Sequence, residues 1–342
     1  MKSKGLNLGV IGAGYAAEHL HWPAFRRLPN VRVRLVHDAD SARAARLAAQ
    51  LPGAAPSDSP HRLIADPSLD AVAILTPPDS HAGLLLAALD ADKHVFVEKP
   101  LTSLPEQIPV LLARAQSSGR VVAAGHNLRC HRLVRKAKAI LQSGALGQLF
   151  ALRGVWISPT RPRAPWNHAP GIAGSVLMDI GVHHIDLFAY LAGSPIQTAH
   201  ASLLGPNRDS ESAAISGSLQ NGTLFTTVMA RQGPYEHSLH IAGSRAAIEF
   251  SCQRANAFRL VEPHHLGLHA QLAEITQYLS QLPALLSSLR TGGDWLDSYF
   301  TQWSEFVAAI HTGSPVPCTI REAAAAVEVC APLASLHTGA AK

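Results

Sequence analysis

The chain has 342 residues, which is more than one hydrophobic core usually serves, so two domains are expected. Its residues are 47% hydrophobic and only 15% charged, and this composition excludes a disordered tail, a collagen-like repeat and a coiled coil. The formal net charge is +5, and the one basic cluster, between residues 129 and 138, is better explained by a solvated helix surface than by a nucleic-acid footprint. We therefore expect no nucleic-acid partner.

The four cysteines stand far apart and form no C-x-x-C pair. This spacing argues against a disulfide framework and against a zinc knuckle, and it suits a reducing compartment. The apolar stretch that follows the first five residues is expected to belong to the first domain and not to a signal peptide. No apolar run approaches the ~20 residues of a membrane-spanning helix. We expect a cytoplasmic protein that has no membrane partner.

The first third of the chain alternates strands and helices. Strands are expected at residues 6–11, 31–36, 71–75, 94–97 and 121–124. Helices are expected from about 17 to 28 and at 41–51, 81–89 and 104–118. Continuous apolar strands separated by helices indicate a parallel sheet that is covered on both faces. Residues 1–124 are therefore predicted to form a doubly wound α/β domain.

The pattern changes after about residue 149. Strands are expected at 150–157, 197–203, 213–219, 223–230, 238–242 and 246–250, and helices at 175–191 and 266–289. Asn221-Gly222 is a strong hairpin signal between two of these strands. Residues 125–342 are predicted to form an α+β domain with an open antiparallel sheet, whose final helices are free to pack back on the first domain. Helix 266–289, which has apolar residues at helical spacing, is expected to pack on the domain that contains this sheet or on a neighbouring subunit.

A glycine-rich turn, Gly12-x-Gly14-x-x-Ala17, follows the first strand and opens a helix. Gly12 allows the tight turn, Gly14 lets the backbone approach a pyrophosphate, and a small residue at 17 allows the helix and the strand to pack closely. Asp38 lies at the end of the second strand, in the place of the acid that binds the ribose hydroxyls of a dinucleotide. A carboxylate there favours NAD over NADP, while Arg34 and Arg43 leave NADP open.

Four further motifs follow in order. They are Thr76-Pro77-Pro78-Asp79-Ser80-His81, Glu98-Lys99-Pro100, Gly125-His126-Asn127-Leu128-Arg129 and the D-x-G-x-H-x-x-D pattern from Asp179 to Asp186. With these motifs the chain resembles the Gfo/Idh/MocA oxidoreductase family over nearly its whole length. It departs from the family in two places. Gly171-Ile172-Ala173-Gly174 stands where members often have three glycines, and residues 254–298 are helical and Leu-rich where members usually have strands and short loops.

The resemblance implies a Rossmann domain and a C-terminal sheet whose flat face forms homodimers or homotetramers. It also implies a nicotinamide cofactor, NAD by preference, and an NAD(P)-dependent dehydrogenase or reductase that acts on a hydroxyl or keto carbon of a polyol, sugar or sugar derivative. A cis bond is common between the Lys and Pro of the third motif. The residues expected at the cofactor are Gly12, Gly14, Tyr15, Ala16, Asp38, Thr76, Pro77, His81, Glu98 and Lys99.

Asp179, His183 and Asp186 are spaced so that a helix presents them on one face. By resemblance, His183 accepts or donates the proton of the reacting hydroxyl, Asp179 orients the substrate, and Lys99 stabilises alkoxide character. Two carboxylates and a histidine also suit zinc or manganese, but no further ligand signature accompanies them, so no metal is expected. Substrate contacts are expected from Asn127, Trp166 and His184.

Other functions remain open for the same fold. One is a non-enzymatic sensor that binds a nicotinamide nucleotide, although a sensor has no need of Lys99, Asp179 and His183 together. Another is redox-assisted glycoside cleavage, in which a tightly bound NAD is regenerated in each cycle. A third is the reduction of an imine or a biliverdin-like compound, for which relatives usually depart from the Lys or His position.

Overall fold

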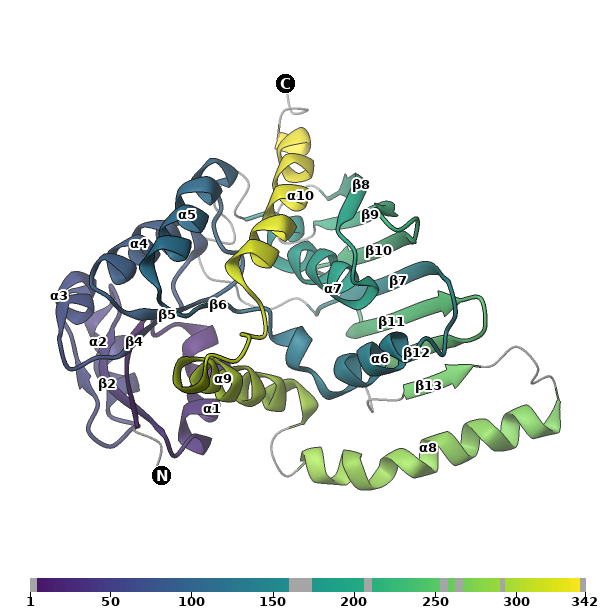
Figure 1. Cartoon of the computed structure of the whole chain (residues 1–342), viewed down its shortest axis with the longest axis horizontal. Coiled ribbons are helices and arrows are strands. Elements are labelled where there is room, and N and C mark those ends of the chain that lie inside the picture. Colours follow the sequence, from purple (N-terminus) through teal and green to yellow (C-terminus); the bar gives the residue numbers. More distant parts are fainter. Residues whose placement is uncertain are drawn as a thin grey trace. The chain divides into compact units, whose positions relative to one another are not determined.

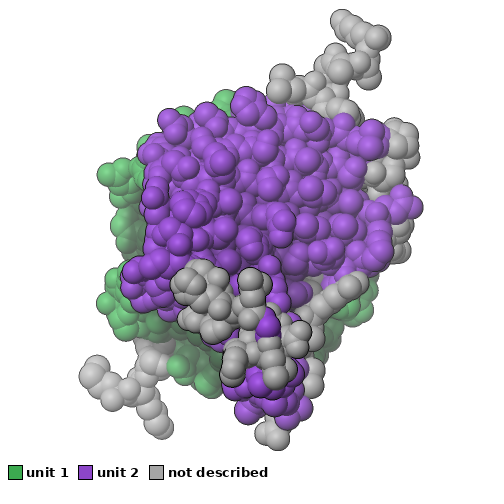
Figure 2. Space-filling model, turned by 90° about the vertical axis from the view of Figure 1, so that its right-hand side faces the viewer, with its two compact units in different colours: residues 1–127, 298–327 green, residues 128–297, 328–342 purple. Residues whose placement is uncertain are grey.

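The computed structural model describes residues 5–159, 174–205, 211–252, 258–261, 267–289 and 293–338. The chain divides into two compact units, which Figure 2 shows in two colours. Unit 1 comprises residues 1–127 and 298–327, and unit 2 comprises residues 128–297 and 328–342. The domain limits predicted from the sequence, 1–124 and 125–342, stay a prediction. Trp166 lies outside the described residues.

Unit 1 contains a six-stranded parallel sheet in the order β3-β2-β1-β4-β5-β6 (Figure 1). The strands are β1 (Leu6–Ile11), β2 (Val31–His37), β3 (Ala55–Pro56), β4 (Ala71–Ile74), β5 (His94–Val97) and β6 (Val122–Ala124). Every side chain of β4 is fully buried, as expected for a central strand that is covered on both faces. The predicted doubly wound sheet is confirmed.

Helices follow the strands of this sheet. They are α1 (Trp22–Arg27), α2 (Ser41–Ala48), α3 (Pro60–Ala65), α4 (His81–Asp90) and α5 (Ile108–Ser118). The sequence prediction missed β3 and α3, because two and six residues are too short to show a hydrophobic period. Ser59 caps α3 and Pro60 occupies its first turn, so the helix begins on local signals alone.

Unit 2 contains a seven-stranded sheet in the order β13-β12-β11-β7-β10-β9-β8. The strands are β7 (Leu149–Ile157), β8 (Ile196–Leu204), β9 (Ser212–Leu219), β10 (Leu224–Ala230), β11 (Glu236–Gly243), β12 (Ala247–Ser251) and β13 (Phe258–Val261). Neighbours run antiparallel except β7 and β10, which pair in parallel. The expected antiparallel sheet is therefore mixed. Parallel neighbours need a crossover connection, and the segment between β7 and β10 supplies it.

Unit 2 also contains the helices α6 (Arg132–Gln142) and α7 (Val182–Ala192). The chain enters α7 through a π-helical turn, η6 (Leu177–Gly181), and a similar turn, η1 (Ala17–His21), precedes α1 in unit 1. Gly154 of β7 lets α7 approach the sheet, because a Cβ there would lie 2.9 Å from the His184 ring. Both π turns interrupt helices that the sequence pattern predicts as regular, and such turns recur at functional sites.

Helix α8 (Leu268–Leu289) confirms the expected helix, and it contacts the edge strand β13 of the unit 2 sheet. Leu272, Ile275, Leu279 and Leu282 are each 45–59% exposed, so this apolar face does not cover the sheet of unit 2. Gln277 and Gln281 face β13 instead, and the amide of each side chain bonds both the N–H and the C=O of one β13 residue. Contact of the apolar face with a neighbouring subunit stays a prediction.

The chain ends in helices α9 (Asp294–Thr312) and α10 (Ile320–Thr338). Within unit 1, Trp303 and Phe306 of α9 pack against Phe96 of β5, with ring centroids 4.3 and 5.9 Å apart. In the part of the chain that the structure describes, no helix combines the length and the apolar character needed to cross a membrane.

The edge contact of α8 is testable by amide hydrogen exchange. Replacing both glutamines (Gln277→Ala, Gln281→Ala) removes the partners of the Phe258 and Leu260 amides, and we expect exchange at these two amides to speed up about tenfold. Ser280→Ala, on the exposed side of the same helix, is the matched control and leaves both amides as they are. Equal exchange rates in the two variants would contradict the contact.

Candidate active site

The glycine turn after β1 has the geometry that a dinucleotide requires. Gly12 has a φ of +102°, and a Cβ there would lie 2.6 Å from the carbonyl oxygen of Leu75, so only glycine fits. A Cβ at Gly14 would meet no atom within 4 Å, so this stretch of backbone is open to a ligand. Ala17 is fully buried, which allows the close helix packing that the motif predicts. The turn fits a pyrophosphate.

Asp38 follows β2 and faces this turn. Its Oδ2 accepts the backbone N–H of Ala13 over 2.7 Å, and its Oδ1 accepts the N–H of Asp40 over 2.9 Å. The Arg43 guanidinium lies 3.8 Å from Asp38 but bonds Asp40 at 2.9 Å. Asp38 is thus fixed beside the glycine turn, as a ribose-binding acid would be. Tyr15, also expected at the cofactor, is 63% exposed.

His81 ties together the ends of two neighbouring strands of unit 1. Its ring nitrogens lie 2.8 Å from the carbonyl oxygens of Thr76 and Pro100, and the side chain is fully buried. Burial lowers the pKa of His81 against the opposing effect of these two hydrogen bonds. Both ring nitrogens lie against backbone carbonyls, so His81 holds the Thr76 and Pro100 turns together, and its expected cofactor contact stays a prediction.

Glu98 and Lys99 lie directly after β5. Glu98 is buried, its Oε1 lies 2.9 Å from His21 Nε2, and its Oε2 accepts the backbone N–H of Lys99 over 3.0 Å. Burial alone would raise the pKa of Glu98, but the hydrogen bonds from His21 and from the Lys99 N–H, together with the charge of Lys99, outweigh it and hold the pKa below its usual value. The bond between Lys99 and Pro100 is cis, as the resemblance implies.

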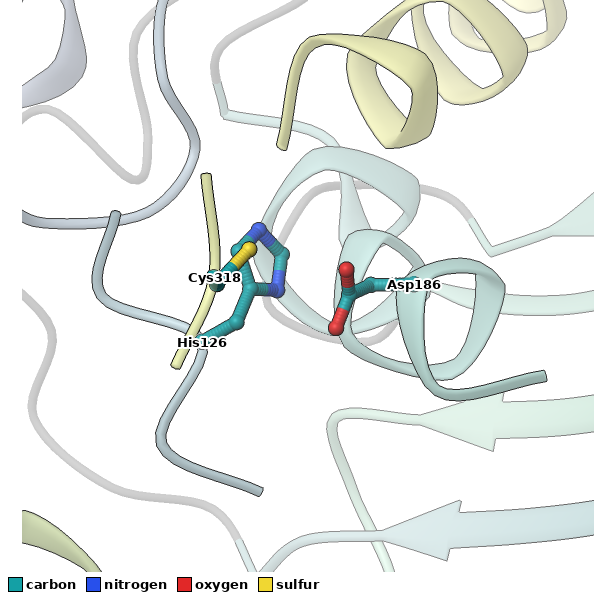
Figure 3. A group of neighbouring side chains, drawn as sticks. All are labelled: His126, Asp186 and Cys318. Atoms are coloured by element: carbon teal, nitrogen blue, oxygen red, sulfur yellow. The ribbon is translucent and has the colours of Figure 1, made fainter. Parts of the chain in front are cut away.

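The segment after β6 brings further polar residues into unit 1. His126 and Cys318 lie side by side in Figure 3, and the chain at Cys318 accepts the N–H of Ala124 over 3.0 Å. Asn127 is fully buried, and its Nδ2 donates to Ser298 Oγ over 2.9 Å. The Asn127 side chain therefore ties its own segment to α9, and its expected substrate contact stays a prediction.

In unit 2, Asp179 lies on the π turn that precedes α7. The guanidinium of Arg231, which is fully buried, lies 3.3 Å from Asp179 Oδ2 and donates to the carbonyl of Gly174 over 2.8 Å. The side chain of Asp179 keeps 24% of its surface exposed. Arg231 thus holds an acid that still faces solvent. The sequence did not predict the role of Arg231, because Arg231 and Asp179 are 52 residues apart and no motif links them.

His183 and His184 are adjacent in sequence but have different surroundings. The His183 ring lies 5.1 Å from the ring of Trp156, and the residue is 5% exposed. His184 is fully buried, with its ring nitrogens 2.5 Å from Thr227 Oγ1 and 3.2 Å from His237. Burial lowers the pKa of His184 to about 3, so the ring is neutral at physiological pH. The expected substrate contact of His184 stays a prediction.

Asp186, which projects from α7 in Figure 3, forms a two-pronged ion pair with Arg129. The closest approach is 2.7 Å, and the side chains of Arg129 and Asp186 are 4% and 1% exposed. Sequence spacing places Asp186 on one helix face with Asp179 and His183, but this ion pair makes Asp186 an anchor for α7 instead of a second acid at the site.

Comparisons with known proteins agree with this geometry. The family model described as an oxidoreductase family with an NAD-binding Rossmann fold matches residues 6–126, and that of the GFO/IDH/MocA C-terminal domain matches residues 134–249. The chain is 30% identical to the oxidoreductase YdgJ of Escherichia coli K12, over 72% of this chain and 71% of that protein. It is 24% identical to myo-inositol 2-dehydrogenase of Thermotoga maritima, over 71% and 74% of the two chains.

Among solved structures, levoglucosan dehydrogenase in complex with NADH and levoglucosan has a TM-score of 0.78 to this chain. The sequences are 20% identical, and the match covers 97% of this chain and 98% of the other. At this identity the likeness concerns the fold.

The buried ion pair between Arg129 and Asp186 should contribute strongly to stability, so we expect its disruption to destabilise the protein. Arg129→Met leaves the buried Asp186 carboxylate without its cation, and we expect a loss of roughly 3–5 kcal/mol in the free energy of unfolding, measured with urea. Arg120→Met is the control, because its partner Asp92 is 70% exposed and such a pair contributes at most about 1 kcal/mol. A similar loss in both variants would contradict the assignment.

Proposed function

Because this chain belongs to the Gfo/Idh/MocA family of NAD-binding oxidoreductases, whose members act on sugar-like and polyol-like substrates, we propose that it transfers a hydride between a nicotinamide cofactor and a hydroxyl or keto carbon of a polyol, sugar or sugar derivative. The observation that carries the proposal is the glycine turn. Gly14 leaves its backbone open, and Asp38 is fixed beside it in the unit that also holds Lys99.

The cofactor, when bound, supplies the carbon that accepts or donates the hydride. Gly12, Gly14 and the N–H groups of the following turn would hold its pyrophosphate, and Asp38 its ribose hydroxyls. Tyr15, Ala16, Thr76, Pro77, Glu98 and Lys99 complete the set by resemblance. Arg43 is the neighbouring cation that could bind a 2′-phosphate, but it forms an ion pair with Asp40. This ion pair supports NAD over NADP as the cofactor, and NADP stays the alternative.

Two side chains handle the proton in this proposal. In the oxidation direction, the C–H bond breaks as the hydride leaves, and the hydroxyl proton passes to the imidazole of His183 while the Lys99 ammonium hydrogen-bonds the developing alkoxide. Asp179, held by Arg231 and still partly exposed, orients the substrate hydroxyls. A histidine suits this role because it changes charge near physiological pH.

Turnover tests these roles. We expect the purified protein to reduce NAD with a member of a panel of inositols, sugars, sugar phosphates and uronates, followed by nicotinamide absorbance. Lys99→Ala and His183→Ala should each lower turnover by ~10²–10⁴-fold, and His183→Ala should leave NAD affinity nearly intact. His61→Ala, an exposed histidine of α3, is the control.

Loss of NAD binding in His183→Ala, or unchanged turnover in either variant, would contradict the assignment. If no compound of the panel changes the nicotinamide absorbance although the cofactor binds, the result would favour a nicotinamide-binding sensor or redox-assisted glycoside cleavage with a permanently bound NAD.

We further propose that the chain forms a homodimer or homotetramer through the open face of the unit 2 sheet. Leu204 of β8 and Leu224 and Val228 of β10 are 76%, 60% and 45% exposed in one chain, and the family resemblance implies an interface on this face. The four cysteines are buried and form no disulfide, which is compatible with a reducing compartment such as the cytoplasm, where we place the reaction.

Sedimentation tests the interface. The double substitution Leu224→Asp, Val228→Asp puts charges on the open face, and we expect it to convert the oligomer to monomers. Val110→Asp, at a valine of α5 that is 51% exposed, is the control and should sediment as the original protein does. A monomeric original protein, or an oligomer that survives the double substitution, would overturn the proposal.

A further inference from the structure

Trp303 of α9 makes a buried hydrogen bond to His21, at the end of the π turn η1. Its indole N–H lies 2.9 Å from His21 Nδ1. The indole nitrogen is a donor only, so Nδ1 must be the accepting, unprotonated nitrogen of the imidazole. The ring proton of neutral His21 is then on Nε2, which lies 2.9 Å from Glu98 Oε1 and donates to it.

Aromatic rings surround this imidazole. The ring centroids of Phe25, Phe96, Tyr299 and Trp303 lie 6.4, 5.7, 5.1 and 6.0 Å from that of His21, and the histidine is fully buried. A hydrogen bond in such apolar surroundings is stronger than one exposed to water, and breaking it leaves a buried polar group unsatisfied. The surroundings of His21 therefore favour one tautomer and one orientation.

The second oxygen of the Glu98 carboxylate accepts the backbone N–H of Lys99 over 3.0 Å. A continuous set of hydrogen bonds therefore joins α9 to the turn after β5: Trp303 donates to His21, His21 donates to Glu98, and Lys99 donates to the same carboxylate. All four residues lie in unit 1.

We propose that Trp303 and His21 are positioning residues that hold the Glu98 carboxylate in the orientation that receives the Lys99 N–H, and so fix the backbone from which the Lys99 side chain projects. The inference rests on the proposed function only for the role of the Lys99 ammonium. The hydrogen bonds themselves need neither cofactor nor substrate.

The chain contains a matched control for Trp303. Trp22 is also fully buried in unit 1 and also packs edge-to-face on Phe25, with ring centroids 5.8 Å apart. Among the described residues, its indole nitrogen has no hydrogen-bond partner. Trp303→Phe and Trp22→Phe therefore both replace an indole by a smaller ring, but only Trp303→Phe removes a hydrogen bond.

The test is hydrogen exchange at the Lys99 backbone amide in the full-length protein without ligands. We expect exchange at this amide to be about tenfold faster in Trp303→Phe than in the original protein, and unchanged in Trp22→Phe. His21→Phe keeps a ring among its aromatic neighbours and removes both imidazole hydrogen bonds, so it should reproduce the acceleration if Trp303→Phe fails to fold. Unchanged exchange in both Trp303→Phe and His21→Phe, or equal acceleration in Trp22→Phe, would overturn the inference.

Two further readouts separate positioning from general stability. Nitrogen-15 spectra of the imidazoles should show His21 protonated at Nε2 alone in the original protein, and a proton on Nδ1 would overturn the inference. With an active substrate, kcat should fall about tenfold in Trp303→Phe and stay unchanged in Trp22→Phe, whereas equal kcat values would overturn the positioning role. Failure of the proposed function would instead appear as absent turnover in every form, and the exchange rates would still decide the inference.

Discussion

The Glu98 carboxylate is buried at the end of β5, and an ionised group in that position requires donors on both oxygens because an unpaired buried charge costs several kcal/mol. Unit 1 meets that requirement with one donor from the turn after the glycine motif, His21, and one from the next residue in the chain, Lys99. Gly125 leaves the space, because a Cβ there would lie 2.7 Å from Glu98 Oε1. Three segments of the unit thus meet at one carboxylate.

In unit 2, two acidic side chains are likewise paired with donors, and these donors are arginines. Arg129 neutralises Asp186 inside the unit, and Arg231 approaches Asp179 from the end of β10. The two acids differ in exposure, because Asp186 is 1% exposed and Asp179 is 24% exposed. A single motif therefore supplies one acid that anchors the helix and one that stays partly exposed to solvent.

Local sequence patterns predicted the strands of both sheets except β3 and β13, the glycine turn and the hairpin at Asn221-Gly222, because backbone conformation and burial there follow from neighbouring residues. The partners that complete the candidate site were not predictable. Trp303 lies 282 residues from His21, and no spacing rule connects them. Periodicity likewise placed the leucines of α8 on one face, but it did not show that the polar Gln277 and Gln281 make the contact with the sheet.

Binding of NADH to the purified protein, followed by nicotinamide fluorescence, tests most directly whether the glycine turn is a dinucleotide site. We expect saturable binding by the original protein. Gly14→Val should abolish it without disturbing the fold, because the new side chain would enter the space next to the backbone that a pyrophosphate needs and a Cβ there meets no protein atom within 4 Å. An original protein that does not bind NADH, or equal affinity in the Gly14→Val protein, would contradict the assignment.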